Sequence, residues 1–317
     1  MPTDSVLPAN ETRGDAAPVE AAASRSPLVP LLVFTIAATL VVFFGVLKVY
    51  AGAPIMVWAW KHWLPNLNQE YGKLVIPIAL WLVWYHRKEI RSAVKEGSNW
   101  GLLFLGAGFL FVLLGTRTLE PRITMLAIPF LILGVVLFLW GAQVARILAF
   151  PIGFLVFMIP VGALQQTSFR LQFLITDAVQ ALCPLIGVKV DAVGTTLTSA
   201  NNAWGFDIAE GCSGIRSLIA IIMLTAVYAH IFEKLWWKKL VLLALSVVFA
   251  VIANIGRVFT IIVIARLGHP QFAGTYHEYL GFISFPIALG AMLFCHKLLN
   301  LRSSKPTVPP EPQTAAS

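Results

Sequence analysis

The sequence predicts an all-α polytopic membrane protein with about eight transmembrane helices and a small extracytoplasmic β-hairpin or loop segment. Of its 317 residues, 58% are hydrophobic and 12% are charged, whereas soluble domains contain about 25% charged residues. Apolar runs long enough to cross about 30 Å of hydrocarbon recur along the chain. Lysines and arginines fall largely in the short loops between these runs. The net charge of +8 therefore reflects membrane topology and argues against a nucleic-acid partner.

The chain divides into a membrane domain and two tails. Residues 1–27 lack an apolar core, and residues 301–317 are polar and rich in proline, so we expect both to be disordered cytoplasmic tails around an integral membrane domain at 28–300. The first apolar run lacks the usual small-residue cleavage site after it, which predicts a helix and not a signal peptide. We expect spans at 27–50, 73–85, 100–115, 123–142, 147–162, 215–232, 240–255 and 279–299.

Three regions between the spans differ in character. Residues 51–72 are rich in tryptophan and tyrosine, which is typical of a segment at the headgroup level. Residues 165–182 mix apolar side chains with glutamine, arginine and aspartate, which favours a helix lying at the interface over a full span. Residues 184–211 contain short β-prone runs, and we expect a hairpin outside the bilayer, because an open strand edge is not tolerated in lipid.

Basic loops set the orientation. The loop at 86–98 is the densest basic loop of the chain and the loop at 233–239 carries three lysines, and together with the C-terminal tail they agree on one cytoplasmic side. Counting spans from a cytoplasmic N-terminus then brings Cys212, Arg257 and His277 to the opposite, extracytoplasmic face. The sequence thus predicts that three separate segments meet there.

Cys212 is the candidate nucleophile among three cysteines. A thiol near its ordinary pKa of about 8.5 is only a few per cent ionised at neutral pH. His277 is a suitable acid/base partner, and Arg257 is a permanent cation for a thiolate, an oxyanion or a carboxylate. Arg216, one helical turn beyond Cys212, and the start of a helix just after it add positive potential.

The other cysteines and histidines of the chain offer alternatives to parts of this site. The chain has no CxxC pair and no Cys/His cluster with metal-ligand spacing, so we expect neither a metal nor another cofactor. A disulfide between Cys183 and Cys212 stays open at this point. His269 is a rival to His277 for the acid/base role. Each residue also has a structural alternative, since a lone cysteine often packs and an arginine at a helix end often extends to headgroups.

Three motifs resemble those of the exosortase/archaeosortase family, in that family's order and at similar separation. They are EGCSGIRS at 210–217, ANIGRV at 253–258 and HEYLG at 277–281, and the resemblance covers about residues 30–300. It implies a membrane-embedded cysteine transpeptidase-like enzyme in which Cys212 is the nucleophile, Arg257 its cationic partner and His277 the acid/base residue. Glu210, Arg216 and Asn254 lie within the motifs, and we expect supporting roles for them.

The resemblance also implies the partners and the location. Substrates would be exported proteins whose C-terminus carries a short Pro-containing motif, a transmembrane helix and a basic cluster. The enzyme would be multi-pass in the inner (cytoplasmic) membrane with its active site on the extracytoplasmic face, and would pass the substrate to an envelope acceptor or to water. The alternatives are a non-catalytic subunit of an envelope polysaccharide system, a small transporter, and a rhomboid-like serine protease, which would need a GxSxG motif that the chain lacks.

Overall fold

A computed structural model describes residues 43–50, 52–64, 69–94, 96–160, 163–200, 204–208, 214–267 and 273–301. Most of the predicted first span, nearly all of both predicted tails, and residues 209–213 and 268–272 lie outside the described residues. At 163–168 and 273–278 the structure describes the helical backbone but not the side chains.

The described chain is almost entirely helical, and the predicted fold class is confirmed. Within the described residues, six helices are long and apolar enough to cross a membrane. The helices are α2 (Ile55–His62), α3 (Gly72–Tyr85), α4 (Arg87–Ala93), α5 (Trp100–Arg117), α6 (Pro121–Phe154), α7 (Ala163–Leu182), α8 (Ile215–Phe232), α9 (Trp236–Arg266) and α10 (Ala273–Leu301), with the single 3-10 turns η2 (Leu155–Met158) and η3 (Cys183–Ile186). The strands are β1 (Val190–Val193), β2 (Thr196–Ser199) and β3 (Gly205–Asp207).

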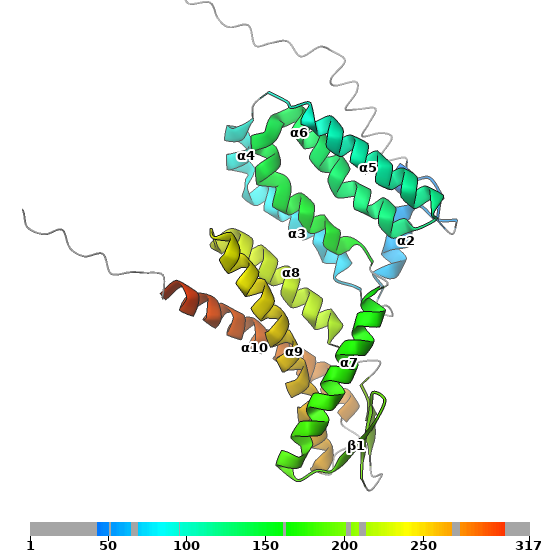
Figure 1. Cartoon of the computed structure of the whole chain (residues 1–317), viewed down its shortest axis with the longest axis vertical. Helices are drawn as coiled ribbons and strands as arrows, with labels where there is room; N and C mark the ends of the chain where they lie inside the picture. Colours follow the sequence, from blue (N-terminus) through cyan, green and yellow to red (C-terminus); the bar gives the residue numbers. More distant parts are fainter. Residues whose placement is uncertain are drawn as a thin grey trace, which may run out of the picture.

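Helix α6 is a hairpin of two antiparallel limbs (Figure 1). The Nε of Arg122, at its start, donates to the carbonyl of Pro160 just beyond its end at 2.7 Å, whereas a straight helix of this length would place them about 55 Å apart. The chain reverses at Gly141, whose φ of 81° is open to glycine. The predicted spans 123–142 and 147–162 are therefore two crossings, but the gap expected between them at 143–146, which contains Arg146, is helical.

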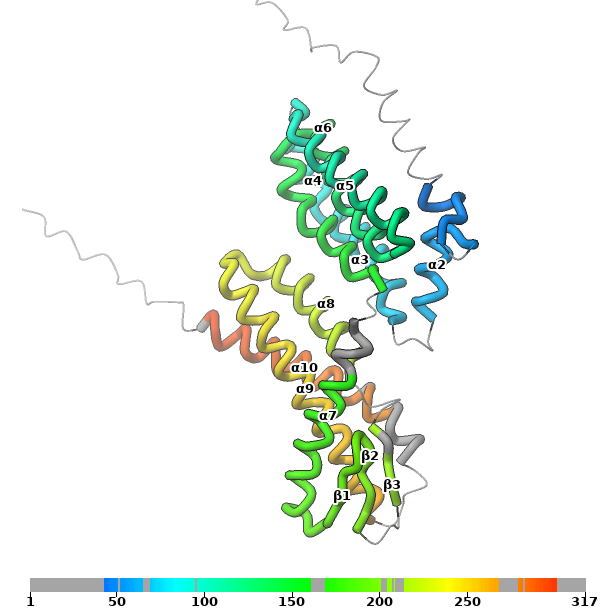
Figure 2. Tube along the Cα trace, turned by 45° about the vertical axis from the view of Figure 1, so that its right-hand side comes forward, coloured from blue at the N-terminus to red at the C-terminus, as the bar shows by residue number. Residues whose placement is uncertain are grey.

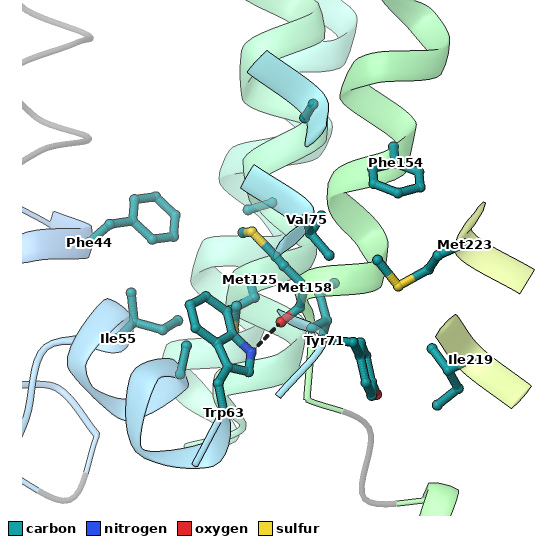
Figure 3. Close-up of a cluster of buried hydrophobic side chains, with 14 of the residues drawn as sticks. Phe44, Ile55, Trp63, Tyr71, Val75, Met125, Phe154, Met158, Ile219 and Met223 are labelled. Atoms are coloured by element: carbon teal, nitrogen blue, oxygen red, sulfur yellow. Dashed lines mark hydrogen bonds between the residues drawn. The ribbon is translucent and has the colours of Figure 1, made fainter. Parts of the chain in front are cut away.

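Part of the predicted interfacial segment 51–72 is core instead. Trp63 follows α2 and is only 3% exposed, and its indole Nε1 donates to the carbonyl of Met158 at 3.0 Å (Figure 3). Trp60, which is 56% exposed, fits the predicted aromatic belt. A tryptophan buried beneath η2 ties the start of the chain to the end of the α6 hairpin.

Helix α8 joins the two halves of the molecule. Residues spaced four apart on one face, Ile215, Ile219, Met223 and Val227, belong to the core of the N-terminal half, α2 to α6. Ile221 and Ala229 face α9 and α10 instead. Two opposed apolar faces explain why this helix occupies the centre of the fold (Figures 1 and 2).

The spans end on two faces. His86, after α3, lies 3.3 Å from His230 near the end of α8 through their Nε2 atoms, so α4 and the turn at Glu233–Leu235 share one face. This basic face carries the arginines and lysines of α4 and of the start of α9. The opposite face, named the sheet face, carries the strands.

A small lobe on the sheet face contains α7, the strands and the second half of α9 (Figure 2). The strands form an antiparallel sheet of order β1-β2-β3, so the predicted hairpin is present with one strand more. Helix α7 has the length and hydropathy of a span, but it runs crosswise to α5 and α8 (Figure 1). Its buried side packs on the sheet and α9 through Ile175 and Val179. The predicted position of α7 at the interface stays a prediction, because its length and hydropathy also suit a span.

Two predicted boundaries were wrong. Helix α9 does not end at 255 but continues to Arg266, because Val258, Ile261 and Ile262 are buried in the core of the lobe. Helix α10 begins at Ala273, so position 277 falls within a helix and not in the predicted polar loop.

Candidate active site

The cysteine motif enters α8 through a constrained glycine. Gly214 immediately precedes the helix, is buried, and adopts a left-handed conformation with φ +64°. A side chain at this position would be strained by the backbone alone. Ile215, the first residue of α8, packs into the N-terminal core. The chain is therefore constrained at Gly214 by its backbone conformation and at Ile215 by packing.

Gly214 also brings the first two motifs together. A Cβ added there would lie 2.6 Å from Cγ and Nδ2 of Asn254 on α9, which means that the Asn254 side chain rests directly on the glycine backbone. Asn254 itself is 5% exposed. The contact places Gly214, which lies two residues after Cys212 in the cysteine motif, against the middle of α9.

Arg257 brings the second motif to the third. It lies three residues after Asn254 on α9, close to the same side of the helix, and is 8% exposed. A Cβ added at Gly281 on α10 would lie 3.2 Å from its Nη1, so the guanidinium packs against the α10 backbone. Position 277 is one helical turn before Gly281.

These two contacts assemble the three motifs from three helices. Asn254 and Arg257 are placed at the centre, with Gly214 on one side and Gly281 on the other. Cys212, Glu210 and the rival His269 lie outside the described residues, as does the side chain of His277. Their direct geometry with Arg257 stays a prediction.

The sequence reasoning missed one charged neighbour of the site. Arg216, in the first turn of α8, has its Nη1 3.8 Å from Oε2 of Glu70. Glu70 precedes α3 and belongs to no motif, so the sequence around it did not indicate a place near the site. It comes from the opposite half of the molecule.

The surroundings favour an anion where the motifs meet. The first turn of α8 presents backbone N–H groups and the positive end of the helix dipole, and Arg216 and Arg257 each add a permanent positive charge. A thiolate or an oxyanion is stabilised by such a field.

The other two cysteines are unsuited to the same chemistry. Cys183 is a free thiol, fully buried among the apolar side chains of α7, the sheet and α9. The structure therefore gives no support to a Cys183–Cys212 disulfide, although Cys212 itself lies outside the described residues. Cys295 is also free and lies four helical turns beyond Gly281 on α10, toward the basic face.

Comparison with known proteins gives one match. A family model described as transmembrane exosortase matches residues 60–294, more than half of the chain, and this range includes all three motifs. No curated protein and no solved structure matches the chain.

Proposed function

The chain belongs to the transmembrane exosortase family, and from this premise we propose that it is a membrane-embedded cysteine protease and transpeptidase. It cleaves the C-terminal sorting signals of exported proteins through a thioester acyl-enzyme. Its substrates carry a short Pro-containing motif followed by a transmembrane helix and a basic cluster. The cleaved protein then passes to an amine of an envelope acceptor or, if water attacks, is released.

The convergence of the motifs is the observation that carries this proposal. Asn254 and Arg257 on α9 contact Gly214 of the cysteine motif and Gly281 of the histidine motif. Three motifs far apart in sequence thus approach one point on the sheet face. A purely structural subunit would need no such arrangement around a cysteine, and a transporter would need charges near the middle of its spans.

The proposed reaction divides one acyl transfer into two steps. The Cys212 thiol gives its proton to His277, and the sulfur attacks the scissile carbonyl. Arg257 or backbone N–H groups hold the oxyanion. The C–N bond then breaks, the leaving nitrogen takes the proton from His277, and the thioester remains. An amine or water loses a proton to His277, attacks the thioester, and the thiol recovers its proton.

The proposed orientation follows from charge. The basic face carries α4 and the lysines at the start of α9, including Lys238 and Lys239, and positive residues near spans are retained in the cytoplasm. The basic face is therefore cytoplasmic in this proposal. The sheet face, with the site, is extracytoplasmic, where exported substrates in the inner membrane present the segment before their helix.

The test is processing of an exported protein from the same genome with the tail described above. Cys212→Ala and Arg257→Ala should each leave that protein uncleaved, while the enzyme still accumulates in the membrane. For Cys212→Ala the loss should exceed a hundredfold, because without this thiol the thioester cannot form; for Arg257→Ala a loss of about a hundredfold is expected, because the oxyanion loses its cationic partner. Cys295→Ala is the matched control and should process normally. Normal cleavage by Cys212→Ala, in a cell without a second such enzyme, would refute the proposal.

A further inference from the structure

A carboxylate from the N-terminal half reaches the cysteine motif. Glu70 Oε2 lies 3.8 Å from Nη1 of Arg216, with their side chains 33% and 52% exposed. An exposed ion pair of this kind contributes little to stability, about 0–1 kcal/mol. Its interest lies in its position, because Arg216 belongs to the same motif as Cys212, four residues later in sequence and two residues after Gly214.

The turn that carries Glu70 is firmly built. The N–H groups of Gly72 and Lys73 donate to the carbonyls of Gln69 and Glu70, both at 3.1 Å. The Trp63 ring covers Gly72 so closely that a side chain at Gly72 would collide with it. Since Trp63 is itself bonded to the carbonyl of Met158 (Figure 3), the backbone at Glu70 is fixed to the N-terminal bundle.

The same turn is packed against α8. Tyr71, the residue after Glu70, lies beside Ile219 of α8 in the shared core (Figure 3). Ile219 is three residues after Arg216, on the same side of the helix. The apolar contact therefore sets the distance at which the Glu70 carboxylate meets the guanidinium of Arg216.

We propose that Glu70 is a positioning residue of the active site, whose carboxylate holds Arg216 at the first turn of α8 and offsets its positive charge beside Cys212. This rests on the proposed cysteine chemistry. Among the described side chains, the charged groups of the Glu70 turn and of the motifs are Glu70, Lys73, Arg216 and Arg257; the motifs add Glu210, His277 and Glu278, and α7 and β1 with the residue before it add Arg170, Asp177, Lys189 and Asp191 on the same face of the molecule.

A moderating carboxylate has a chemical reason. Two arginines and a helix N-terminus all stabilise the thiolate, yet the nucleophilicity of a thiolate falls as the pKa of its thiol falls. The best attacking thiol has a pKa near ambient pH. By offsetting the charge of Arg216, Glu70 keeps the thiol from becoming too acidic to be a good nucleophile.

The test measures the pH dependence of Cys212 alkylation by a membrane-impermeant maleimide in the full-length protein, with Cys183 and Cys295 replaced by alanine. Glu70→Gln should move the alkylation profile to lower pH by about half a unit, the size expected for one charge acting across a wet site. Glu70→Asp, which keeps the charge, should restore most of the profile. Glu120→Gln is the matched control, because Glu120 also pairs with an arginine, at 2.8 Å, and is 38% exposed.

A second arm asks whether Glu70 acts through Arg216. In an Arg216→Gln background, Glu70→Gln should no longer move the profile. An unchanged profile in Glu70→Gln, or the same shift with and without Arg216, would overturn the inference while leaving the cysteine mechanism intact. If Cys212→Ala still processes substrate, the mechanism itself fails, so the two failures are distinguishable.

Discussion

At the scale of single residues, glycines decide how closely the motifs approach. Gly214 and Gly281 each leave room for one side chain of α9, Asn254 in the first case and Arg257 in the second. Neither glycine has a chemical role of its own. Gly214 is needed because a side chain would occupy the space that Asn254 fills, whereas a side chain at Gly281 would push the end of Arg257 by a few tenths of an ångström.

Gly214→Ala should abolish substrate processing while most of the membrane fold persists. The added methyl group meets both a positive φ, which costs about 1–3 kcal/mol, and the Asn254 side chain at 2.6 Å, so the cysteine motif must move off α9. Gly106→Ala is the control, since a Cβ at this lipid-exposed position of α5 meets open space. Processing assays on membranes with equal enzyme content provide the comparison, and near-normal activity in Gly214→Ala would show that the contact does not position the motif.

The sequence predicted residue types at the site better than their contacts. The motifs indicated Arg257 and Asn254 without any geometry. The contacts of Gly214 with Asn254 and of Glu70 with Arg216 join distant segments, and no local pattern encodes which residues become neighbours after folding. Glu70 in particular is an ordinary acidic residue in a polar stretch.

At the scale of elements, helix boundaries depended on surroundings that the sequence does not display. The sequence predicted a span that ends at 255, just before Arg257. Helix α9 continues beyond it because the lobe on the sheet face provides a second apolar environment for Ile261 and Ile262. The sequence predicted a gap between two spans at Arg146. The chain instead reverses at Gly141, where the backbone needs a positive φ. Charged residues mark the edge of lipid, which is not always the end of a helix.

In the turn between α8 and α9, Glu233 holds the end of α10 through His296, and we expect this contact to be lost in acid. Glu233 is 7% exposed, and its Oε2 accepts from Nε2 of His296 at 3.0 Å. Burial raises the pKa of Glu233, but hydrogen bonds from His296 and the backbone at Leu235, with the charge of Lys238, outweigh it and lower the pKa below its ordinary value. The stabilisation is therefore complete above the ordinary carboxyl pKa of about 4.3 and is lost as pH falls through the lower folded value.

Hydrogen exchange at the end of α10 should detect this contact. Protection of the backbone around His296 should fall on acidification below about pH 4 in the native protein, and Glu233→Gln should already show reduced protection at pH 7. Glu89→Gln is the control, because Glu89 pairs with His86 at 3.1 Å but is 65% exposed, and exposed pairs contribute little. Equal loss of protection in both variants would contradict the assignment.

At the scale of the whole molecule, two bundles meet along α8, and the site lies where they join. The N-terminal bundle supplies the Glu70 turn and the apolar surface for Ile219, while α9 and α10 supply Asn254 and Arg257 with their glycine contacts. Loop charges predicted which span ends share a face, because retention of positive loops is a property of the whole topology. They could not predict which spans pack together, since apolar sequences are much alike in lipid.

Cross-linking across the two bundles tests this arrangement. His86 and His230 approach to 3.3 Å between their Nε2 atoms at the basic face, and the Phe150 ring stacks on His230 at 3.9 Å between centroids. A His86→Cys/His230→Cys pair, in a chain whose native cysteines are replaced by alanine, should therefore be joined by a short bifunctional methanethiosulfonate reagent, because the thiols lie further back than the imidazole tips that meet, and mass spectrometry identifies the joined peptides. A His62→Cys/His230→Cys pair should not, because His62 ends α2 just before Trp63, whose bond to Met158 lies at the sheet face. If the control pair is joined by the reagent as readily as the test pair, or if the test pair is not joined, α8 does not bridge the bundles as described. The site would then have to be built from the C-terminal half alone, without Glu70.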